Sequence, residues 1–262
     1  MSFKINELFS VEGKTAIVTG GSRGIGKMIA EGFVENGVKT YISARKAEAC
    51  FATAEELSKK GTCIAFPADM STKEGRDAFI EEIKSRENKI DILVNNAGAA
   101  WGASFEEYPD AGYDKVMNIN VKAVFTLTRD LMPLLTKDAT PENPSRVINI
   151  GSIDGLRVST TDNFAYGASK AAVHFLTKNL AVRLAPKGVT VNAIAPGAFE
   201  SRMMDYMLTN FRDKIEAENP LGRIGRPTDV AGLALYLASE ASKYMTGQVI
   251  AIDGGRHLGS RQ

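Results

Sequence analysis

Cysteine is nearly absent from the sequence, since Cys50 and Cys63 are the only two among 262 residues. Two cysteines cannot build the disulfide framework of a small secreted domain, so they indicate a reducing compartment. Excess charge of either sign is also missing, because 32 Lys and Arg against 31 Asp and Glu leave a formal net charge of +1. A protein that binds a nucleic acid backbone needs a clear basic excess, so we expect no nucleic acid partner.

Long apolar runs are absent as well. No segment approaches the roughly 18 uninterrupted apolar residues that a membrane-spanning helix needs. The first ten residues include Lys4, Asn6 and Glu7 and so lack the apolar core of a signal peptide. We therefore expect a cytoplasmic protein without a membrane partner. No repeat, low-complexity tract or linker divides the chain, and we expect one domain over residues 1–262.

Short runs rich in β-forming residues alternate with amphipathic stretches along the whole chain. Several of these runs are almost continuously apolar, as strands covered on both faces require. The predicted strands are residues 15–19, 40–43, 63–66, 90–94, 146–150, 189–193 and 248–252. The predicted helices include residues 26–36, 47–59, 71–85, 121–135 and 168–184. Regular alternation predicts an α/β fold, a Rossmann-type doubly wound parallel sheet of about seven strands with helices on both faces.

A glycine-rich turn joins the first predicted strand to the first helix. Gly20, Gly24 and Gly26 fall within it. Such glycines permit a tight turn and the close approach of the backbone to a pyrophosphate, and the helix N-terminus then presents N–H groups to that anion. A plain tight turn would explain the glycines alone. Their place between a strand and a helix favours a dinucleotide site.

Several motifs in a fixed order resemble the short-chain dehydrogenase/reductase family over nearly the whole chain. They are the glycine pattern of residues 19–26, Asn95-Asn-Ala-Gly98, Asn118-Ile-Asn120, Tyr166-x-x-x-Lys170, Pro196-Gly197 and Asp253-Gly-Gly255. The resemblance implies that Asp69 contacts the adenine and that Ser201 touches the nicotinamide carboxamide. The implied cofactor-binding set is Gly20, Ser22, Arg23, Gly24, Ile25, Gly26, Arg45, Asp69, Met70, Asn96, Ala97, Gly98, Tyr166, Lys170, Pro196, Gly197 and Ser201.

Charge at the end of the second predicted strand favours NADPH over NADH. An NAD-specific site usually has a carboxylate there, bonded to the ribose 2′-hydroxyl. This chain has Ser43, Ala44 and Arg45 instead. Arg45 and the glycine-turn Arg23 would flank a 2′-phosphate with charge-assisted hydrogen bonds. The alternative is that both arginines are ordinary solvated surface residues.

Tyr166 and Lys170 lie four residues apart and therefore share one face of a helix. A free tyrosine has a pKa of ~10, and a lysine charge ~4 Å away at an effective dielectric of ~20 would lower that pKa by up to ~3. Tyr166 is thus the predicted proton donor to a carbonyl oxygen, and Ser152 would stabilise developing charge on the same oxygen. By resemblance, Lys170 also binds the nicotinamide ribose and Asn120 holds a water that links Lys170 to solvent. We expect no metal, because His174 and His257 lack partners at ligand spacing.

Substrate selection is predicted from the position and apolar character of a variable segment. By resemblance, residues 198–221 cover the substrate, and their many methionines suit an adaptable apolar lid. The candidate substrate residues are Trp101, Asp154, Phe199 and Met203. Within the family the chain most resembles the 3-oxoacyl reductases, and among them the NADPH-dependent β-ketoacyl reductases of the rhamnolipid pathway. A small carbonyl or alcohol, free or linked to coenzyme A or an acyl-carrier protein, is the expected substrate. Lys178, Arg183 and Lys187 are candidates for docking an acidic carrier, although Asp138 and Glu142 oppose it.

Two other functions stay open. Sugar-acid dehydrogenases such as gluconate 5-dehydrogenase share many of the motifs. A non-catalytic NADP sensor would keep the fold, although such proteins commonly lose the tyrosine or the lysine, and both are present here.

A homotetramer is expected from helices with two apolar sides. The predicted helices 121–135 and 168–184 resemble the family's dimer pair and carry more apolar residues than one buried stripe needs. The last strand and the tail to Gln262 resemble a second interface. Two isologous interfaces would give a dimer of dimers.

Overall fold

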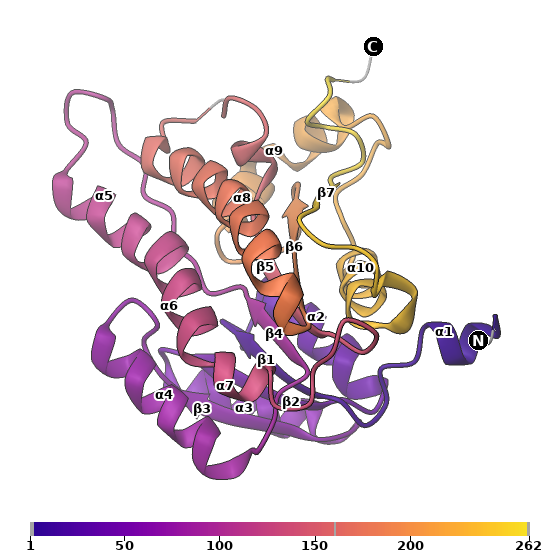
Figure 1. Cartoon of the computed structure of the whole chain (residues 1–262). Coiled ribbons are helices and arrows are strands. Elements are labelled where there is room, and N and C mark those ends of the chain that lie inside the picture. The colour runs from indigo at the N-terminus through magenta and orange to yellow at the C-terminus, as the bar shows by residue number, and fades with distance from the viewer. Residues whose placement is uncertain (1–2, 160, 261–262) are drawn as a thin grey trace.

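A single seven-stranded sheet forms the centre of the molecule (Figure 1). The computed structural model describes residues 3–159 and 161–260. The strands are β1 (Thr15–Thr19), β2 (Lys39–Ala44), β3 (Cys63–Pro67), β4 (Ile92–Asn95), β5 (Ser145–Ile150), β6 (Val189–Pro196) and β7 (Val249–Ile252). Their order is β3-β2-β1-β4-β5-β6-β7, and each neighbouring pair is parallel. The predicted doubly wound parallel sheet is therefore confirmed.

Helices cover both faces of this sheet. In chain order they are α1 (Ile5–Leu8), α2 (Gly24–Glu35), α3 (Ala47–Leu57), α4 (Lys73–Arg86), α5 (Asp110–Met117), α6 (Ala123–Asp130), α7 (Met132–Leu135), α8 (Phe164–Leu184), α9 (Asp205–Glu218) and α10 (Pro227–Ala238). Apolar residues of α2, α3 and α10 form one core with the sheet, and those of α4, α6 and α8 form another. Successive strand residues alternate between the cores, as Ile17 and Val18 do.

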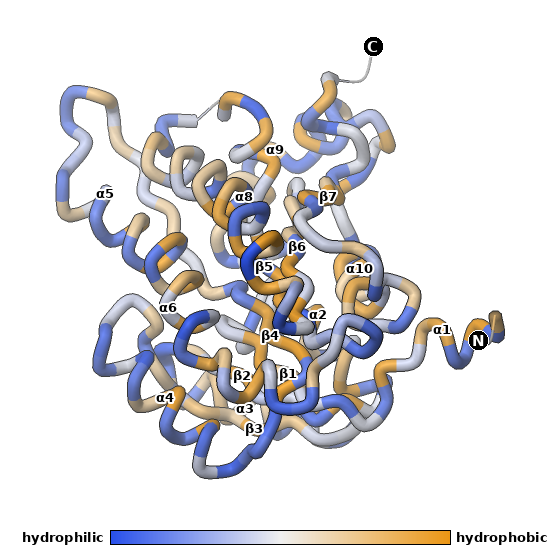
Figure 2. Tube along the Cα trace, in the orientation of Figure 1, coloured by the Kyte–Doolittle hydropathy of each residue, from blue (hydrophilic) through white to orange (hydrophobic). Residues whose placement is uncertain are grey.

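Hydrophobic residues are concentrated in the central strands, while many outer loops are hydrophilic (Figure 2). This distribution explains why the strands read as apolar runs, since both of their faces are covered. Within residues 3–159 and 161–260, no helix has the length and apolar character to cross a membrane.

The prediction of one continuous helix over residues 121–135 was wrong. A π-helical turn, η1 (Asn118–Lys122), joins α5 to α6, and the helix is interrupted again between α6 and α7. Pro133 explains the second break, because proline lacks the N–H that a continuing helix needs and its ring clashes with the preceding turn. The helix expected at residue 168 begins earlier, at Phe164, which places Tyr166 in its first turn.

The two halves of the sheet meet between β1 and β4. The chain first adds β2 and β3 on one side of β1, and then crosses to build β4 to β7 on the other side. In open parallel sheets, ligands bind beyond the carboxyl ends of the strands at such a reversal of order. The glycine turn follows β1, Asn96 follows β4 and Ser152 follows β5, so these predicted site residues lie at that edge.

Candidate active site

Lys170 connects the helix α8 to the end of strand β5. Its Nζ donates a hydrogen bond of 2.7 Å to the carbonyl oxygen of Ile150, and it lies 5.5 Å from the centroid of the Tyr166 ring. The Lys170 side chain is buried, and this burial lowers its pKa to about 8. A lysine near that pKa exchanges protons readily around neutral pH.

Tyr166 lies one helical turn before Lys170 and beside Ser152. Burial raises the pKa of Tyr166 to about 12, the hydroxyl of Ser152 acts in the opposite direction, and the carboxylate of Asp154 raises the pKa further. The expected lowering of this pKa by Lys170 is not found, because desolvation dominates and the ammonium is bonded to the Ile150 carbonyl. Tyr166 is therefore protonated at neutral pH, as a proton donor must be.

Ser152 begins a short 3₁₀ turn directly after β5. Its Oγ accepts a hydrogen bond of 3.1 Å from the backbone N–H of Asp154, and Ser152 is thereby the N-terminal cap of the turn Ile153–Gly155. This bond uses an acceptor position of the hydroxyl and leaves its O–H group as a donor. The turn therefore places a hydroxyl donor beside the Tyr166 hydroxyl.

Asn120 lies in the π-helical turn and is almost completely buried. Its Nδ2 donates to the carbonyl oxygen of Ala99 at 3.0 Å and to Ser169 Oγ at 2.9 Å, and its Oδ1 accepts from the N–H of Ala99 at 2.9 Å. π-Helical turns occur frequently at functional sites because they redirect a side chain. Here the turn aims Asn120 at the segment after β4 and joins that segment to α8.

Glycines shape the turn after β1 through their backbone conformation and through a close contact. Gly20 and Gly24 have positive φ values of 67° and 52°, which glycine adopts without strain. A Cβ at Gly26 would lie 2.4 Å from Nδ2 of Asn96, and that Nδ2 donates to the carbonyl oxygens of Thr19 and Gly20 at 2.8 and 3.2 Å. The segment after β4 thus closes tightly onto the glycine turn, and α2 begins at Gly24 with its N-terminus at the same edge.

The remaining predicted cofactor residues follow the ends of the strands around this turn. They are Ser22, Arg23 and Ile25 after β1, Arg45 after β2, Asp69 and Met70 after β3, Ala97 and Gly98 after β4, and Gly197 and Ser201 after β6, which ends at Pro196. Asp69 Oδ1 accepts hydrogen bonds from the N–H and Oγ of Ser71 at 2.9 and 2.6 Å. A Cβ at Gly24 would lie 3.0 Å from the Cβ of Ser201, so the segment after β6 touches the glycine turn.

Sequence reasoning missed several residues that hold this edge together. Thr19 Oγ1 accepts from the N–H groups of Asn96 and Ala97, both at 3.0 Å. The buried Arg76 donates from Nη1 to the carbonyl oxygen of Met70 at 2.9 Å and fixes the segment after β3. The threonine at the end of a strand was visible in the sequence, but nothing indicated that Arg76 would be buried.

The four candidate substrate residues lie in different surroundings. Asp154 is half-buried and accepts a hydrogen bond of 3.3 Å from Asn163. Trp101 lies against Gly112, whose added Cβ would be 2.9 Å from the indole ring. Met203 is exposed. Phe199 differs from the expectation, because it is 2% exposed and packs in the core against Gly225, so its ring does not line an open cleft.

The predicted covering segment, residues 198–221, contains the whole of α9. Several of its large apolar side chains are exposed: Met203, Tyr206, Phe211 and Leu221. Phe211 has a non-helical backbone conformation that kinks α9, with φ −139° and ψ 20°. Exposed apolar groups of this kind are candidates for contact with an apolar ligand.

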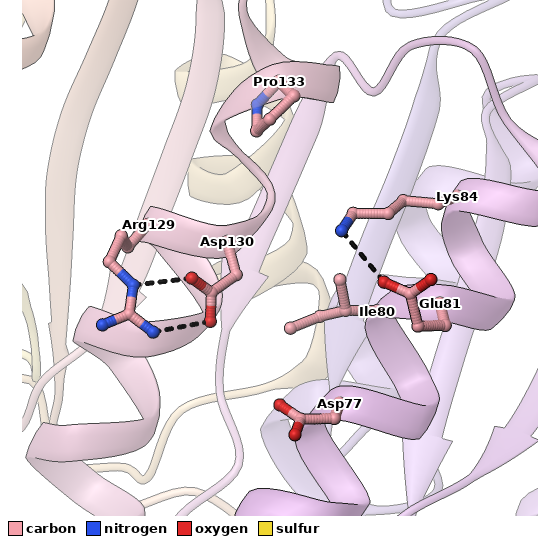
Figure 3. Close-up of a pocket in the computed structure, with 7 residues that line it drawn as sticks. All are labelled: Asp77, Ile80, Glu81, Lys84, Arg129, Asp130 and Pro133. Atoms are coloured by element: carbon pink, nitrogen blue, oxygen red, sulfur yellow. Dashed lines mark hydrogen bonds and ion pairs between the residues drawn. The ribbon is translucent and has the colours of Figure 1, made fainter.

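A groove of about 310 Å³ lies between α4 and α6, apart from the predicted site residues (Figure 3). It is lined by Asp77, Ile80, Glu81, Lys84, Arg129, Asp130 and Pro133. Lys84 pairs with Glu81 at 3.0 Å and Arg129 pairs with Asp130 at 2.6 Å, so these opposite charges satisfy one another. The groove shares no residue with the candidate active site.

Comparison with known proteins gives full-length matches. A family model described as enoyl-(acyl carrier protein) reductase matches residues 20–257. The rhamnolipids biosynthesis 3-oxoacyl-(acyl-carrier-protein) reductase of Pseudomonas aeruginosa is 49% identical over 253 residues, which are 95% of this chain and 98% of that protein. The solved Pseudomonas aeruginosa RhlG/NADP active-site complex is 49% identical, with a TM-score of 0.93, and covers 96% of this chain and 99% of that one. The solved structure of a gluconate 5-dehydrogenase from Burkholderia cenocepacia, in complex with NADP and tartrate, is 28% identical with a TM-score of 0.90. That match covers 98% of this chain and 100% of the other.

The buried charge of Lys170 predicts a pH-dependent stability difference. Its pKa is lowered from 10.5 to about 8, which corresponds to about 3 kcal/mol of unfavourable free energy for the charged form in the folded state. This term is fully present below pH 8 and disappears as the pH rises toward 10.5, where the unfolded lysine also loses its proton. We therefore expect the free energy of unfolding of Lys170→Met, relative to the wild type, to be up to about 3 kcal/mol higher at pH 6 to 7 than at pH 10. This gain at low pH adds to a loss from the missing hydrogen bond to Ile150, which is the same at every pH.

Urea unfolding at several pH values measures this difference. Lys178→Met is the matched control, because Lys178 is an exposed lysine on the same helix, and it should give no such trend. A gain that stays constant with pH would contradict the prediction.

Proposed function

The chain belongs to the short-chain dehydrogenase/reductase family, and we propose that it reduces a ketone to a secondary alcohol with NADPH. Its preferred substrate is a 3-oxoacyl thioester, carried by coenzyme A or an acyl-carrier protein. The observation that carries the proposal is the convergence of Ser152, Tyr166 and Lys170 at the end of β5, on the same sheet edge as the glycine turn. The 49% identity to a 3-oxoacyl-(acyl-carrier-protein) reductase supports the substrate class.

The residues at the glycine turn fit a dinucleotide. Side chains at positions 20 and 26 would collide with Asn96, so the turn stays narrow and its backbone stays accessible to a pyrophosphate. Arg23 follows β1 and Arg45 follows β2, both residues are exposed, and in this proposal they flank the 2′-phosphate. Because both arginines are exposed, their charges are accessible to a 2′-phosphate. The solved NADP complexes among the similar proteins agree with this fit.

Each catalytic residue has a role that follows from its surroundings. When bound at the glycine turn, NADPH would supply a hydride for the carbonyl carbon. Tyr166 donates its proton to the carbonyl oxygen, and its high pKa keeps that proton in place until negative charge develops. The Ser152 hydroxyl donates a hydrogen bond to the same oxygen. Lys170 holds the nicotinamide ribose and returns a proton toward Tyr166, with Asn120 shaping the path to solvent.

Residues 1–262 act as one domain in this proposal, with residues 198–221 covering the substrate. The exposed apolar side chains of that segment favour an acyl chain over a sugar. Asp154, which faces Tyr166 closely enough to raise its pKa, would repel the carboxylate of a sugar acid. Trp101 and Met203 are the further proposed substrate contacts, and Phe199 supports the segment from the core. A sugar or sugar-acid dehydrogenase activity, like that named for the gluconate 5-dehydrogenase of Burkholderia cenocepacia, is the second candidate function.

Removing the Tyr166 hydroxyl tests the reaction. Tyr166→Phe keeps the ring and loses only the proton donor, so we expect unchanged NADPH binding and a loss of 3-oxoacyl reduction by at least about 100-fold. NADPH oxidation is followed with 3-oxoacyl-coenzyme A, with a β-ketoester and with a keto-sugar acid. Tyr244→Phe, which removes the hydroxyl of a fully exposed tyrosine outside the candidate site, is the matched control. Wild-type turnover in Tyr166→Phe would rule out the assignment of the proton donor.

The cofactor preference depends on charge at Arg45. We expect the wild type to bind NADPH more tightly than NADH, and Arg45→Asp to narrow or reverse that preference, because a carboxylate repels the 2′-phosphate. Fluorescence titration with both cofactors measures it. Lys59→Asp makes the same charge change elsewhere on the surface and should leave the preference unaltered. Tighter binding of NADH by the wild type would refute the proposal.

The assembly is a homotetramer in this proposal, with a second copy of the chain covering the apolar surface of α6 and α8. Val124, Leu127 and Val173 are buried within the subunit, whereas Phe125, Phe175 and Val182 are exposed by 42%, 71% and 74%. A groove of about 410 Å³ lies on this surface and is lined by Met117, Asn118, Val121, Lys122, Phe125 and Leu176. The second interface would involve β7 and the tail, whose residues 261–262 lie outside the described residues.

A charge on this surface should break the assembly. Phe175→Asp places a carboxylate at the centre of the proposed contact, so we expect a smaller particle and a lower activity, because α8 also carries Tyr166 and Lys170. Gel filtration with light scattering at micromolar concentration gives the mass. Phe51→Asp is the control, since Phe51 is an exposed phenylalanine on α3. A wild-type mass equal to that of a monomer would disprove the proposal.

A further inference from the structure

His174 is a buried polar residue for which the proposed reaction has no role. It lies on α8 one turn after Lys170 and is 5% exposed. Within the described residues, neither its Nδ1 nor its Nε2 forms a hydrogen bond. Desolvation lowers the pKa of His174 to about 4. The charge of Lys170 lowers this pKa further, and the backbone of Gly155 acts in the opposite direction. The ring is therefore neutral at physiological pH and is held in place by packing.

The ring packs against the two glycines that bracket Ser152. A Cβ at Gly151 would lie 2.1 Å from Nε2 and 2.7 Å from Cδ2 of His174. A Cβ at Gly155 would lie 2.8 Å from Cε1 of His174 and 2.7 Å from the backbone nitrogen of Ala171. The segment 151–155 therefore closes onto one face of α8, and the imidazole fills the space beneath it.

This contact sets the geometry of the Ser152 turn. Gly151 is anchored on its other side by its N–H, which donates to the Ile194 carbonyl oxygen at 2.7 Å. Gly155 closes the turn on itself, because its N–H donates to the Ser152 carbonyl oxygen at 3.0 Å. With Gly151 bonded to β6 and the turn closed on itself, the depth of the turn over α8 is limited by the groups that lie under it. Those groups are the ring of His174, which lies under both glycines, and the α8 backbone at Lys170 and Ala171, which lies under Gly155.

We propose that His174 is a positioning residue for catalysis, whose ring supports the turn 151–155 and so holds the Ser152 hydroxyl beside Tyr166. The inference rests on the proposed function, because it acts through Ser152. An imidazole that is neutral supports the turn without adding a second positive charge next to Lys170. Displacing a catalytic group by ~1 Å is enough to lower a rate by about 100-fold, so a small movement of the turn has a measurable effect.

The contact is tested by adding a methyl group at position 151 and removing the ring at position 174, singly and together. Gly151 does not have a positive φ, so the strain on an alanine there comes mainly from the ring. We expect Gly151→Ala to lower kcat for 3-oxoacyl reduction by about 100-fold, and His174→Ala to lower it by about tenfold. In Gly151→Ala/His174→Ala the nearest atom to the new methyl group is the Ile194 carbonyl oxygen at 3.3 Å. The double variant should therefore be at least about tenfold faster than Gly151→Ala alone, because the clash is gone.

Ser152→Ala separates this role from a general structural one. If His174 acts through Ser152, His174→Ala should lower kcat by less than about twofold once Ser152 is alanine. NADPH binding should stay unchanged in every variant, and KM should change little, because in this proposal the ring acts on the reaction only through the turn that holds Ser152. Val173→Ala is the matched control for lost packing, because Val173 is buried on the same helix. It should lower thermal stability with little effect on kcat.

Two results would overturn the inference. One is a double variant no faster than Gly151→Ala, and the other is an equal loss from His174→Ala with and without the Ser152 hydroxyl. His174→Leu, which refills most of the volume, is the second variant if the alanine variant does not fold, and should retain more activity than any smaller residue. If Ser152→Ala itself leaves kcat unchanged, the proposed role of Ser152 in the reaction is wrong, which is a separate outcome.

Discussion

The hydrogen bond from Lys170 to the carbonyl oxygen of Ile150 is the interaction on which the candidate site depends. It joins the long helix α8 to the end of β5 at 2.7 Å and so fixes the position of the helix relative to that strand. Because Tyr166 is one turn away on the same helix, its position follows from the same bond. Burying the ammonium is unfavourable, as its lowered pKa indicates, and the rest of the fold offsets this penalty.

Small residues around Lys170 make such close packing possible. Gly98 lies where an added Cβ would be 3.8 Å from Nζ of Lys170 and 3.2 Å from Oδ1 of Asn120. Gly151 and Gly155 allow the Ser152 turn to contact α8 directly. Where side chains are absent, backbone segments approach each other closely and hold functional groups in fixed positions. The glycines of this edge therefore serve packing as much as the binding of a nucleotide.

A buried polar chain holds the same elements together below the site. Asn95 on β4 donates to Asn149 Oδ1 at 2.9 Å and to Thr128 Oγ1 on α6 at 3.2 Å, and Asn149 on β5 donates to Thr177 Oγ1 on α8 at 2.9 Å. Hydrogen bonds between buried groups are directional and strongly penalised when broken, so they specify one arrangement of sheet and helices. The two helices that carry the proposed subunit interface are thereby tied to the strands that end at the site.

The sequence by itself determined those features that depend on near neighbours along the chain. The seven strands follow from β-rich runs, the glycine turn from its place between a strand and a helix, and the shared face of Tyr166 and Lys170 from a spacing of four. Only the tertiary structure decided the features that depend on burial. It replaced the expected lowering of the Tyr166 pKa with a rise, moved Phe199 into the core, broke the helix expected over residues 121–135, and placed His174 beneath Gly151. Desolvation and packing arise from residues far apart in the chain, and local patterns carry no information on which of these will meet.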